Sequence, residues 1–447
     1  MMTPEEARAL ARRAVELTAA DEAEALVVDG ASALTRFANN HIHQNVAEED
    51  AAVSVRAVLG KRVGVASTNR TDEQSLRAVA ESAVRAASQA PEDPAFPGLP
   101  EPEPVDERSD RAAEATRVFG AEQRARAVGA IIDQSASRGL VAAGTLSTSS
   151  RVTAVANSKG VAVAMPTTGA KATVLSMGPD SGSGWASWTG MDASELAPAA
   201  LGEEAATLAE RSANPSDLEP GEYPVVLAPD AVADILDFLA YVGFSAKAYE
   251  EGRSFMSGKL EQCNFGSELV TIVDDARSAE AMGITFDYEG MPKRVVRMIE
   301  YGVAMRPVTD SYWASKGGWP NSGHALPAPN EFGPYPVNMA WEPGEATIDE
   351  LIGGIERGVY VTRFHYVNVE DPMTVLLTGM TRDGTFMIED GRLTRPLKNQ
   401  RFTQSALAAL LHTSGVTRER RFVGSEENAS LVPAIRVNKF NFTGQTT

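Results

Sequence analysis

The sequence predicts an α+β protein of two domains, with an α/β N-terminal half and a mainly antiparallel β C-terminal half. Three observations support this. The chain has 447 residues, enough for two or three separate cores. Short apolar runs joined by tight turns are interspersed with amphipathic segments of helical spacing. Segment 214–221, which contains two prolines, is typical of a linker, so we place the domains at 1–213 and 221–447.

The first half shows the order helix, strands, helix twice. In 1–90, Thr3 and Glu6 form a capping box for a helix over 4–17, and Thr71 is the expected cap of a second helix. Short strands are expected at 25–28, 34–37, 41–46, 51–59 and 63–66. Because the links between them are too short for crossovers, these strands should form an antiparallel meander.

A second unit follows a proline-rich surface connection at 91–106. Helices are expected over 111–134 and 193–212, with strands at 141–146, 152–156, 161–165 and 172–176 between them. The glycine- and serine-rich run 178–184 is predicted to be a flexible loop bordering a cleft. The two units, 1–90 and 109–213, suggest an internal duplication.

The second half is organised around an apolar strand at 223–228 that leads into a helix over 229–243. Asp230 is the expected N-cap, and the apolar face carries Val232, Ile235 and Leu236. Asp234 and Asp237 lie on the polar side and are expected to be solvated. Further strands are predicted at 270–273, 359–364 and 373–380, with a hairpin turn at 382–384. Helices should begin after Thr347 and near 405.

Composition excludes several classes of function. The net charge of −19 argues against direct binding to nucleic acid or to an anionic membrane. The single cysteine, Cys263, excludes an internal disulfide and is expected to be a structural thiol. The N-terminus has the pattern of a capped helix rather than a signal peptide, and no apolar stretch is long enough to span a bilayer. We therefore expect a cytoplasmic protein.

The histidines offer two possible sites. His41 and His43 share one face of a predicted strand, but a metal site needs three or four convergent ligands and no third lies nearby. In the second half, three histidines could converge with carboxylates, or each could simply be packed or hydrogen-bonded. These residues are His324, His365 and His412, with Asp274, Asp275 and Glu251.

Several strings resemble the TldD/PmbA family, which is also named after a proposed modulation of DNA gyrase. The resemblance covers nearly the whole chain. Its strings include Arg36-Phe-Ala-Asn-Asn40, Gly243-Phe-Ser245, Glu251-Gly-Arg-Ser-Phe255, Gly323-His-Ala-Leu326, Leu377-Thr-Gly-Met-Thr-Arg-Asp-Gly-Thr385 and Pro396-Leu-Lys-Asn399. The resemblance implies the two-domain TldD/PmbA-like fold and a dimer with a substrate cleft.

In the TldD branch, the resemblance implies a zinc metallopeptidase whose metal is held by HExxxH on a helix and by a later cysteine. Here that helix falls on 229–243, and the motif positions fall near Asp237, Phe238 and Val242. Cys263 lies upstream of the family's cysteine. The resemblance therefore implies the PmbA/TldE branch, the non-catalytic subunit of a heterodimeric complex that degrades unfolded peptides. Zinc is expected in a TldD-like partner and not in this chain.

The family strings supply candidate substrate-cleft residues. They are Arg253, Ser254, Phe255, His324, Arg363, Thr378 and Arg382. Two alternatives stay open. One is a homodimeric metallopeptidase with a non-standard metal site, and the other is a regulatory binding protein.

Overall fold

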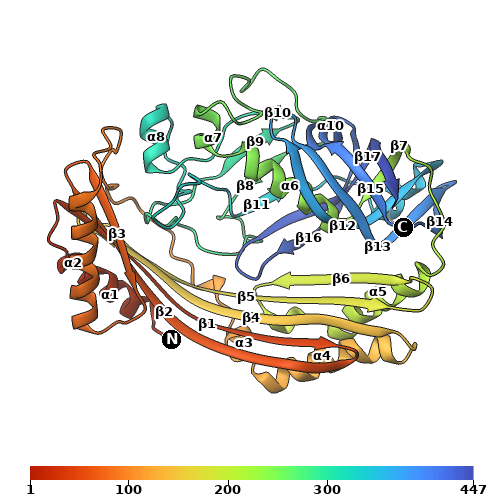
Figure 1. The fold of residues 1–447 in the computed structure, drawn as a ribbon, viewed down its shortest axis with the longest axis horizontal. Coiled ribbons are helices and arrows are strands. Elements are labelled where there is room, and N and C mark those ends of the chain that lie inside the picture. Colours follow the sequence, from red (N-terminus) through yellow and green to blue (C-terminus); the bar gives the residue numbers. More distant parts are fainter. Residues whose placement is uncertain (446–447) are drawn as a thin grey trace.

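A computed structural model of the chain describes residues 1–445 and contains two β-sheets that face each other (Figure 1). The first sheet has six strands in the order β3-β2-β1-β4-β5-β6, and every neighbouring pair is antiparallel. The first half is therefore α+β with an antiparallel sheet, which corrects its predicted α/β character. The strands are β1 (Glu22–Ala38), β2 (His41–Leu59), β3 (Arg62–Thr68), β4 (Val141–Asn157), β5 (Ala162–Met177) and β6 (Ser183–Gly190).

The helices of this half cover the face of the sheet that is turned away from the second half (Figure 1). They are α1 (Pro4–Glu16), α2 (Glu73–Gln89), α3 (Glu114–Arg117), α4 (Ala121–Ala136) and α5 (Pro198–Arg211), with 3-10 turns at Ser109–Arg111 and Ala193–Glu195. The predicted order of helix, strands and helix occurs twice. The capping box of Thr3 and Glu6 is confirmed. The cap of α2 is Asp72 instead of Thr71, because the Asp72 carboxylate accepts the N–H of Ser75 at 3.0 Å.

The strands of the first sheet are much longer than predicted, because the small residues between the predicted segments continue them. Gly30 lies within β1, and 147–151 lies within β4. Small residues are required where the second half packs closely. A Cβ atom at Gly169 in β5 would lie 1.7 Å from the carbonyl oxygen of Glu426. The run 178–184, predicted to be a loop, forms a turn whose last residues already belong to β6.

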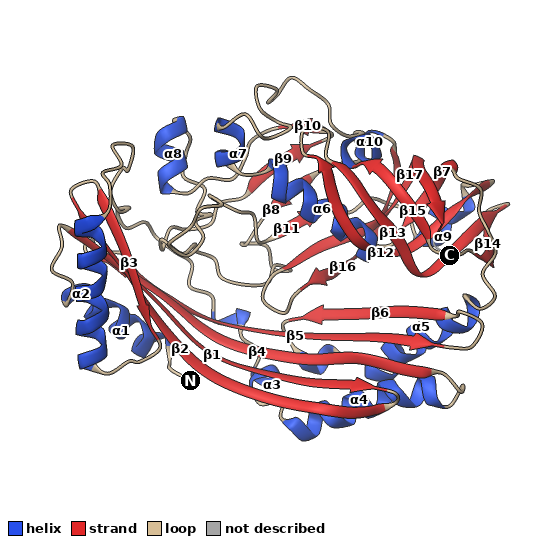
Figure 2. Ribbon diagram, viewed as in Figure 1, coloured by secondary structure: helices blue, strands red, loops and turns tan. Residues whose placement is uncertain are grey.

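The second half contains a mixed eleven-stranded sheet (Figure 2). Strands β17, β15, β13, β12 and β7 form a closed ring, because β17 also pairs with β7. Two pairings are parallel, β11 with β17 and β12 with β7, and the others are antiparallel. The strands are β7 (Gly221–Leu227), β8 (Ile272–Asp274), β9 (Val296–Glu300), β10 (Val303–Ala304), β11 (Met339–Trp341), β12 (Arg357–Asp371), β13 (Leu376–Glu389), β14 (Arg392–Pro396), β15 (Gln400–Ser405), β16 (Thr413–Gly424) and β17 (Ala429–Gln445).

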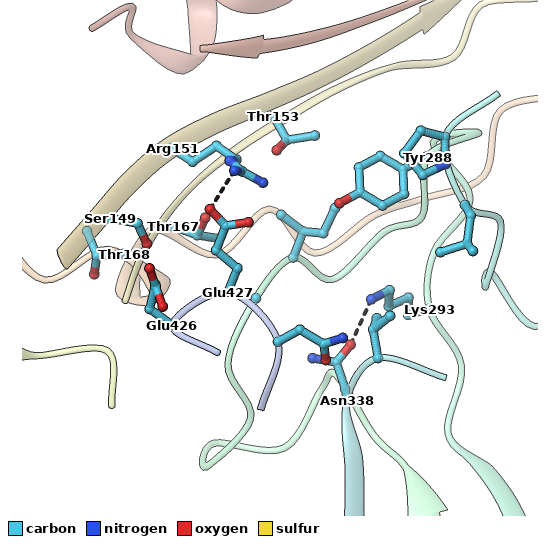
Figure 3. A pocket seen from close by; sticks show the side chains of 16 residues that line it. Ser149, Arg151, Thr153, Thr167, Thr168, Tyr288, Lys293, Asn338, Glu426 and Glu427 are labelled. Carbon is cyan, nitrogen blue, oxygen red and sulfur yellow. Dashed lines mark hydrogen bonds and ion pairs between the residues drawn. The ribbon is translucent and has the colours of Figure 1, made fainter. Parts of the chain in front are cut away.

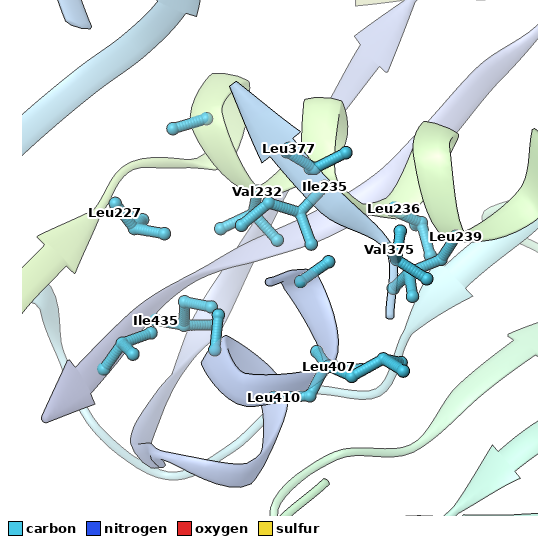
Figure 4. Packing of buried hydrophobic residues seen from close by; sticks show 14 of the residues in the cluster. Leu227, Val232, Ile235, Leu236, Leu239, Val375, Leu377, Leu407, Leu410 and Ile435 are labelled. Atoms are coloured by element: carbon cyan, nitrogen blue, oxygen red, sulfur yellow. The ribbon is translucent and has the colours of Figure 1, made fainter. Parts of the chain in front are cut away.

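Five helices belong to this half, and α6 lies in its core. They are α6 (Pro229–Gly243), α7 (Ala246–Glu250), α8 (Ser311–Gly317), α9 (Ile348–Gly353) and α10 (Ala406–Leu411). Leu236 and Leu239 of α6 pack with Leu407 and Leu410 of α10 (Figure 4). The predicted bounds of α6 are confirmed, but its N-cap is Ala228, so Asp230 lies inside the first turn.

The hairpin turn predicted at 382–384 is wrong. The chain runs through these residues as part of β13, and the β12–β13 connection lies at 372–375. Asp383 and Gly384 instead have positive φ angles of 56° and 122°, and the β12–β13 register shifts beside them. The signal of Asp-Gly therefore marked a bulge, which uses the same left-handed backbone conformations as a turn.

The two halves meet through an apolar cluster and a buried ion cluster. Leu26 and Met165 of the first sheet pack against Ile284 and Phe286. Nearby, the Arg56 guanidinium of β2 lies 2.7 Å from Glu24 of β1 and 3.1 Å from Glu289 of the second half. Among residues 1–445, no helix is long and apolar enough to cross a membrane.

Candidate functional site

Helix α6 carries a stripe of residues that do not belong to its buried face. Asp230, Asp234, Asp237, Phe238 and Tyr241 are half-buried or exposed, while the residues between them are mostly buried. Their spacing of three or four residues places them along one side of the helix. The sequence thus builds one apolar side that anchors α6 in the core and one side that presents three carboxylates.

The three positions of the family's zinc motif do not converge. Asp237 is exposed, as predicted, and Phe238 is half-buried against the core. Val242 is 6% exposed and belongs to the main apolar core. These side chains therefore point to different surroundings. Phe238 and Val242 also have no atom that could hold a metal or move a proton.

Beside this stripe, two neighbouring strands bring together Arg363 of β12 and Arg382 of β13, which lie directly opposite each other. Asp383 joins them. Its carboxylate accepts the Nε–H of Arg363 at 2.8 Å and lies 3.7 Å from Nε of Arg382. The Arg363 guanidinium also lies 4.1 Å from the centre of the Trp185 ring of β6. The bulge in β13 thus turns a buried aspartate toward two arginines predicted for the cleft.

The electrostatics of α6 follow from its burial. Burial raises the pKa of Asp234 to about 7, and the charges of Asp237 and Asp230 act in the same direction while Arg363 opposes them. The surrounding protein also raises the pKa of Asp237 to about 6, although this side chain is exposed. Asp234 is half-buried, so the prediction that it is fully solvated is wrong. Two carboxyls on this side of α6, those of Asp234 and Asp237, therefore have raised pKa values.

Three of the other predicted cleft residues are buried and do not line a surface. Ser254 donates to the carbonyl oxygen of Gly243 at 2.7 Å, and Phe255 packs edge-to-face on Phe244 and Phe265. His324 is 1% exposed.

The remaining two candidates differ from these. Arg253 is exposed and donates to Glu251 at 2.9 Å, and Thr378 lies in β13, where it donates to Phe402 at 3.3 Å. Of the seven candidates, the structure brings together only Arg363 and Arg382. Substrate contact by any of them stays a prediction.

His324 does approach Asp274, one of the carboxylates considered with it. Its Nε2 lies 3.0 Å from Oδ1 of Asp274, and its Nδ1 lies 2.9 Å from the hydroxyl of Ser322. Both side chains are completely buried, and the Ser322 hydroxyl donates to the carbonyl of Thr309. This Ser-His-Asp chain therefore lacks access for a substrate and holds the local backbone in place.

The other histidines do not join this pair. His365 lies in β12, where burial, Arg382 and Arg363 lower its pKa, and His412 follows α10. His41 and His43 lie on exposed β2, where the register shift makes His43 an extra residue. Within residues 1–445, no group of three or more His, Cys, Asp or Glu residues is placed to hold a metal ion. Cys263 is half-buried against the main core.

A separate polar pocket of about 240 Å³ lies between β4, β5 and loops of the second half (Figure 3). Arg151 forms an ion pair with Glu427 at one side of it. At the other side, Nζ of Lys293 donates to Asn338 at 2.7 Å. Burial lowers the pKa of Lys293, while Asp274 and Asp287 oppose this. The Arg151–Glu427 pair connects the first half to the second, and the lining comes from both, so the pocket belongs to the joint between the halves.

The domain organisation agrees with one known protein family along most of the chain. Family models described as PmbA/TldA metallopeptidase domain 1, central domain and C-terminal domain match residues 23–87, 99–213 and 220–444. The chain belongs to the PmbA/TldD metallopeptidase family. The family's models change at the linker between the two sheets, where α5 ends and β7 begins.

Individual members of the family are distant relatives. A metalloprotease from Methanothermobacter thermautotrophicus is 27% identical over 224 residues, which cover 49% of this chain and 47% of that protein. A zinc metalloprotease TldD homolog from Saccharolobus solfataricus is 25% identical over 197 residues, 42% of each chain. The matched region thus spans less than half the length of these relatives.

Two solved structures establish the fold over almost the whole chain. TldE from Thermococcus kodakarensis superposes with a TM-score of 0.89 at 20% identity, covering 99% of this chain and all of that one. A protein from Thermotoga maritima, named for a proposed modulation of a DNA gyrase, gives a TM-score of 0.86 at 17% identity, covering 94% and 96%. At these identities the likeness concerns the fold alone.

Proposed function

We propose that this chain is the non-catalytic, TldE/PmbA-like subunit of a heterodimeric zinc metallopeptidase complex that processes unfolded peptides. The observation that supports this most directly is the composition of α6. The family resemblance implies that α6 corresponds to the metal-binding helix of TldD proteins. The exposed side of α6 carries Asp230, Asp234, Asp237, Phe238 and Tyr241. Neither a histidine pair nor a glutamate base is present there.

The residues of this chain do not fit a peptidase zinc site. Zinc sites in peptidases combine two histidines with a third ligand, and a glutamate acts on the bound water. On α6 only carboxylates are available, and Arg363, whose charge acts on Asp234, is a cation that would repel a metal ion. We therefore assign zinc to a TldD-like partner and derive no catalytic step for this chain.

The proposed role of this chain is to complete the cleft and to hold an extended peptide. Backbone pairing at a sheet edge binds peptides with little side-chain specificity. Strand β2 offers such an edge, because β3 pairs with β2 only from Val53 to Leu59. Among residues 1–445, His41 to Ala52 have no second partner strand. Arg382, half-exposed beside α6, is suited to bind a peptide carboxylate.

The test is a measurement of metal content and casein cleavage on the untagged chain, alone and mixed with a TldD-like protein. We expect no stoichiometric zinc and no cleavage by the chain alone, and cleavage once the partner is added. Arg382→Ala should slow cleavage by the mixture, while Arg392→Ala, an exposed control on β14, should not.

Other results would reject the proposal. Zinc near one ion per chain with chelator-sensitive cleavage would establish a homodimeric peptidase and direct mutagenesis to His324, His365 and His412. If the TldD-like partner cleaves no more casein with this chain than without it, the result would favour a regulatory binding protein. The net charge of −19 then favours a protein target over DNA.

A further inference from the structure

A pocket of about 350 Å³ lies where the two halves meet at the N-terminal end of α6. Its walls come from β6 and α5 of the first half, and from α6, β12 and β16 of the second. Small-molecule sites commonly have volumes of about 300–1,000 Å³ and lie at such domain interfaces. The three zinc-motif positions do not line this pocket, and neither do Arg363 and Arg382.

The pocket walls are apolar and aromatic. The ring of Trp185 and the ring of Tyr360 both line the space, together with Pro229 and Ile348. Indole and phenol rings attract organic cations through their negative faces. The Trp185 ring already has the Arg363 guanidinium 4.1 Å from its centre, so Trp185 mainly offers apolar contact here. Burial and the charge of Glu204 raise the pKa of Tyr360 to about 12, so its hydroxyl stays protonated.

The charged groups in the lining leave a negative excess. Arg421 is already used, because its guanidinium donates to Glu204 at 3.1 Å and to the Ser187 carbonyl at 3.1 Å. Asp230 and Glu419 remain without an ion pair among residues 1–445. Arg211 lies near but outside the lining, with its guanidinium over the Phe386 ring at 5.2 Å. The charge of Arg421 also acts on Asp230, but the lining holds three carboxylates against this one arginine, so an anion would meet a negative excess.

Asp230 is held in place as an acceptor facing the space. Its Oδ1 accepts the indole N–H of Trp185 at 3.2 Å and the hydroxyl of Ser187 at 3.0 Å. Among the described residues, no donor reaches Oδ2. A fixed carboxylate with one free oxygen beside two aromatic rings is the arrangement that binds an ammonium group on an apolar body.

We propose that this pocket binds an organic amine, with its ammonium group at Asp230 and its apolar part against Trp185 and Tyr360. The amine can belong to a free small molecule or to the N-terminus of a peptide. Both sources present the same chemistry.

The test is calorimetric titration of the full chain with phenethylamine and with phenylacetate, which replaces the ammonium by a carboxylate. We expect phenethylamine to bind and phenylacetate not to bind. Asp230→Asn keeps a hydrogen-bond acceptor but removes the charge, so it should weaken phenethylamine binding about tenfold. Asp237→Asn, a carboxylate on the same helix outside the pocket, is the matched control and should bind like the original chain.

A second variant protects the test against loss of folding. Glu419 is exposed at the pocket mouth, so Glu419→Gln should leave the thermal melt unchanged and weaken binding about two- to threefold. Competition by Phe-Gly-Gly but not by its acetylated form would identify a peptide N-terminus as the source, and competition by neither would identify free amines. Equal binding of phenylacetate, unchanged binding by both variants, or no binding of phenethylamine would overturn the proposal.

Discussion

The first sheet and segment 275–338, which is mostly irregular outside β9, β10 and α8, satisfy their backbones in different ways. In the sheet, long antiparallel ladders pair the N–H and C=O groups, so its side chains can be small and apolar. In the segment, buried carboxylates replace the ladder. Asp287 accepts the N–H groups of Glu289, Met291 and Ala325, each at 2.9 Å. Asp287 thus supplies acceptors that a ladder of strands would otherwise provide, because buried polar groups must find partners.

The largest expected effect comes from removing such a carboxylate. Asp287→Ala would leave three buried N–H groups without an acceptor, at about 1–3 kcal/mol each, so we expect a loss of unfolding free energy of about 3–9 kcal/mol. Urea denaturation measures it. Asp371→Ala is the control, because Asp371 accepts the N–H of Met373 at 3.1 Å in an exposed turn, where water can replace it. Equal losses in the two variants would show that burial does not distinguish the regions.

The next effect concerns the joint between the two regions. Arg56→Ala would leave Glu24 and Glu289 as buried carboxylates without their cation, and breaking a buried pair in this way costs about 3–5 kcal/mol. Burial already raises the pKa of Glu24 to about 7, so the loss should be larger at pH 8 than at pH 5, where Glu24 is neutral.

The control for this joint is Arg85→Ala on α2, whose ion pair with Glu81 is exposed on both sides. It should change stability by less than about 1 kcal/mol. If Arg56→Ala lowered the unfolding free energy no more than this control does, the ion cluster would not stabilise the contact between the halves.

A smaller effect tests the regular side of the comparison. Gly169→Ala places a methyl group against the Glu426 carbonyl, and overpacking of this kind typically costs about 1–3 kcal/mol. Gly444→Ala in β17 is the matched control, since a Cβ there has no neighbour within 4 Å. If Gly169→Ala left the unfolding free energy unchanged, the 425–428 loop would move to accommodate the methyl group. Close packing would then not explain why small residues occur in β5.

The same comparison explains what the sequence could predict. Helices α1, α6 and α9 were found because their signals are local: the caps at Thr3 and Thr347, and the apolar spacing of α6. The length of β1 and β4 was not predictable, because small residues such as Gly30 become strand through contacts with distant segments.

In the candidate site, too, some features were predictable from the sequence and others depend on distant contacts. Arg363 and Arg382 were predicted from family strings, but Asp383, which joins them, was interpreted as part of a turn. Trp185, which contacts Arg363, was not among the predicted cleft residues. The Asp-Gly pair was the available signal, yet no local rule distinguishes a turn from a bulge within a long strand. The exposed stripe of α6 was predictable from helical spacing alone, since it is the complement of the apolar face.

The smallest effect is a pH dependence carried by one helix cap. Asp310 is the N-cap of α8, where it accepts the N–H of Trp313 at 2.8 Å. Burial and the charge of Glu289 raise its pKa to about 7. An unfolded aspartate titrates near pH 4, so the folded state holds an extra proton between these values. The stability from this proton is complete below pH 4 and is lost as the pH rises through 7.

Between pH 6 and 8, loss of this proton should lower the unfolding free energy by about 1.4 kcal/mol. Asp310→Asn preserves the cap but cannot titrate. From pH 6 to pH 8 the unfolding free energy of this variant should therefore fall by about 1.4 kcal/mol less than that of the original chain. Asp72→Asn is the control, because Asp72 caps the exposed helix α2 and its hydrogen bonds with Ser75 lower its pKa. Urea midpoints at pH 6 and 8 compare the three chains. If Asp310→Asn kept the original slope, the proton would reside on another buried carboxyl of the same cluster, with Glu24 the first to replace by glutamine.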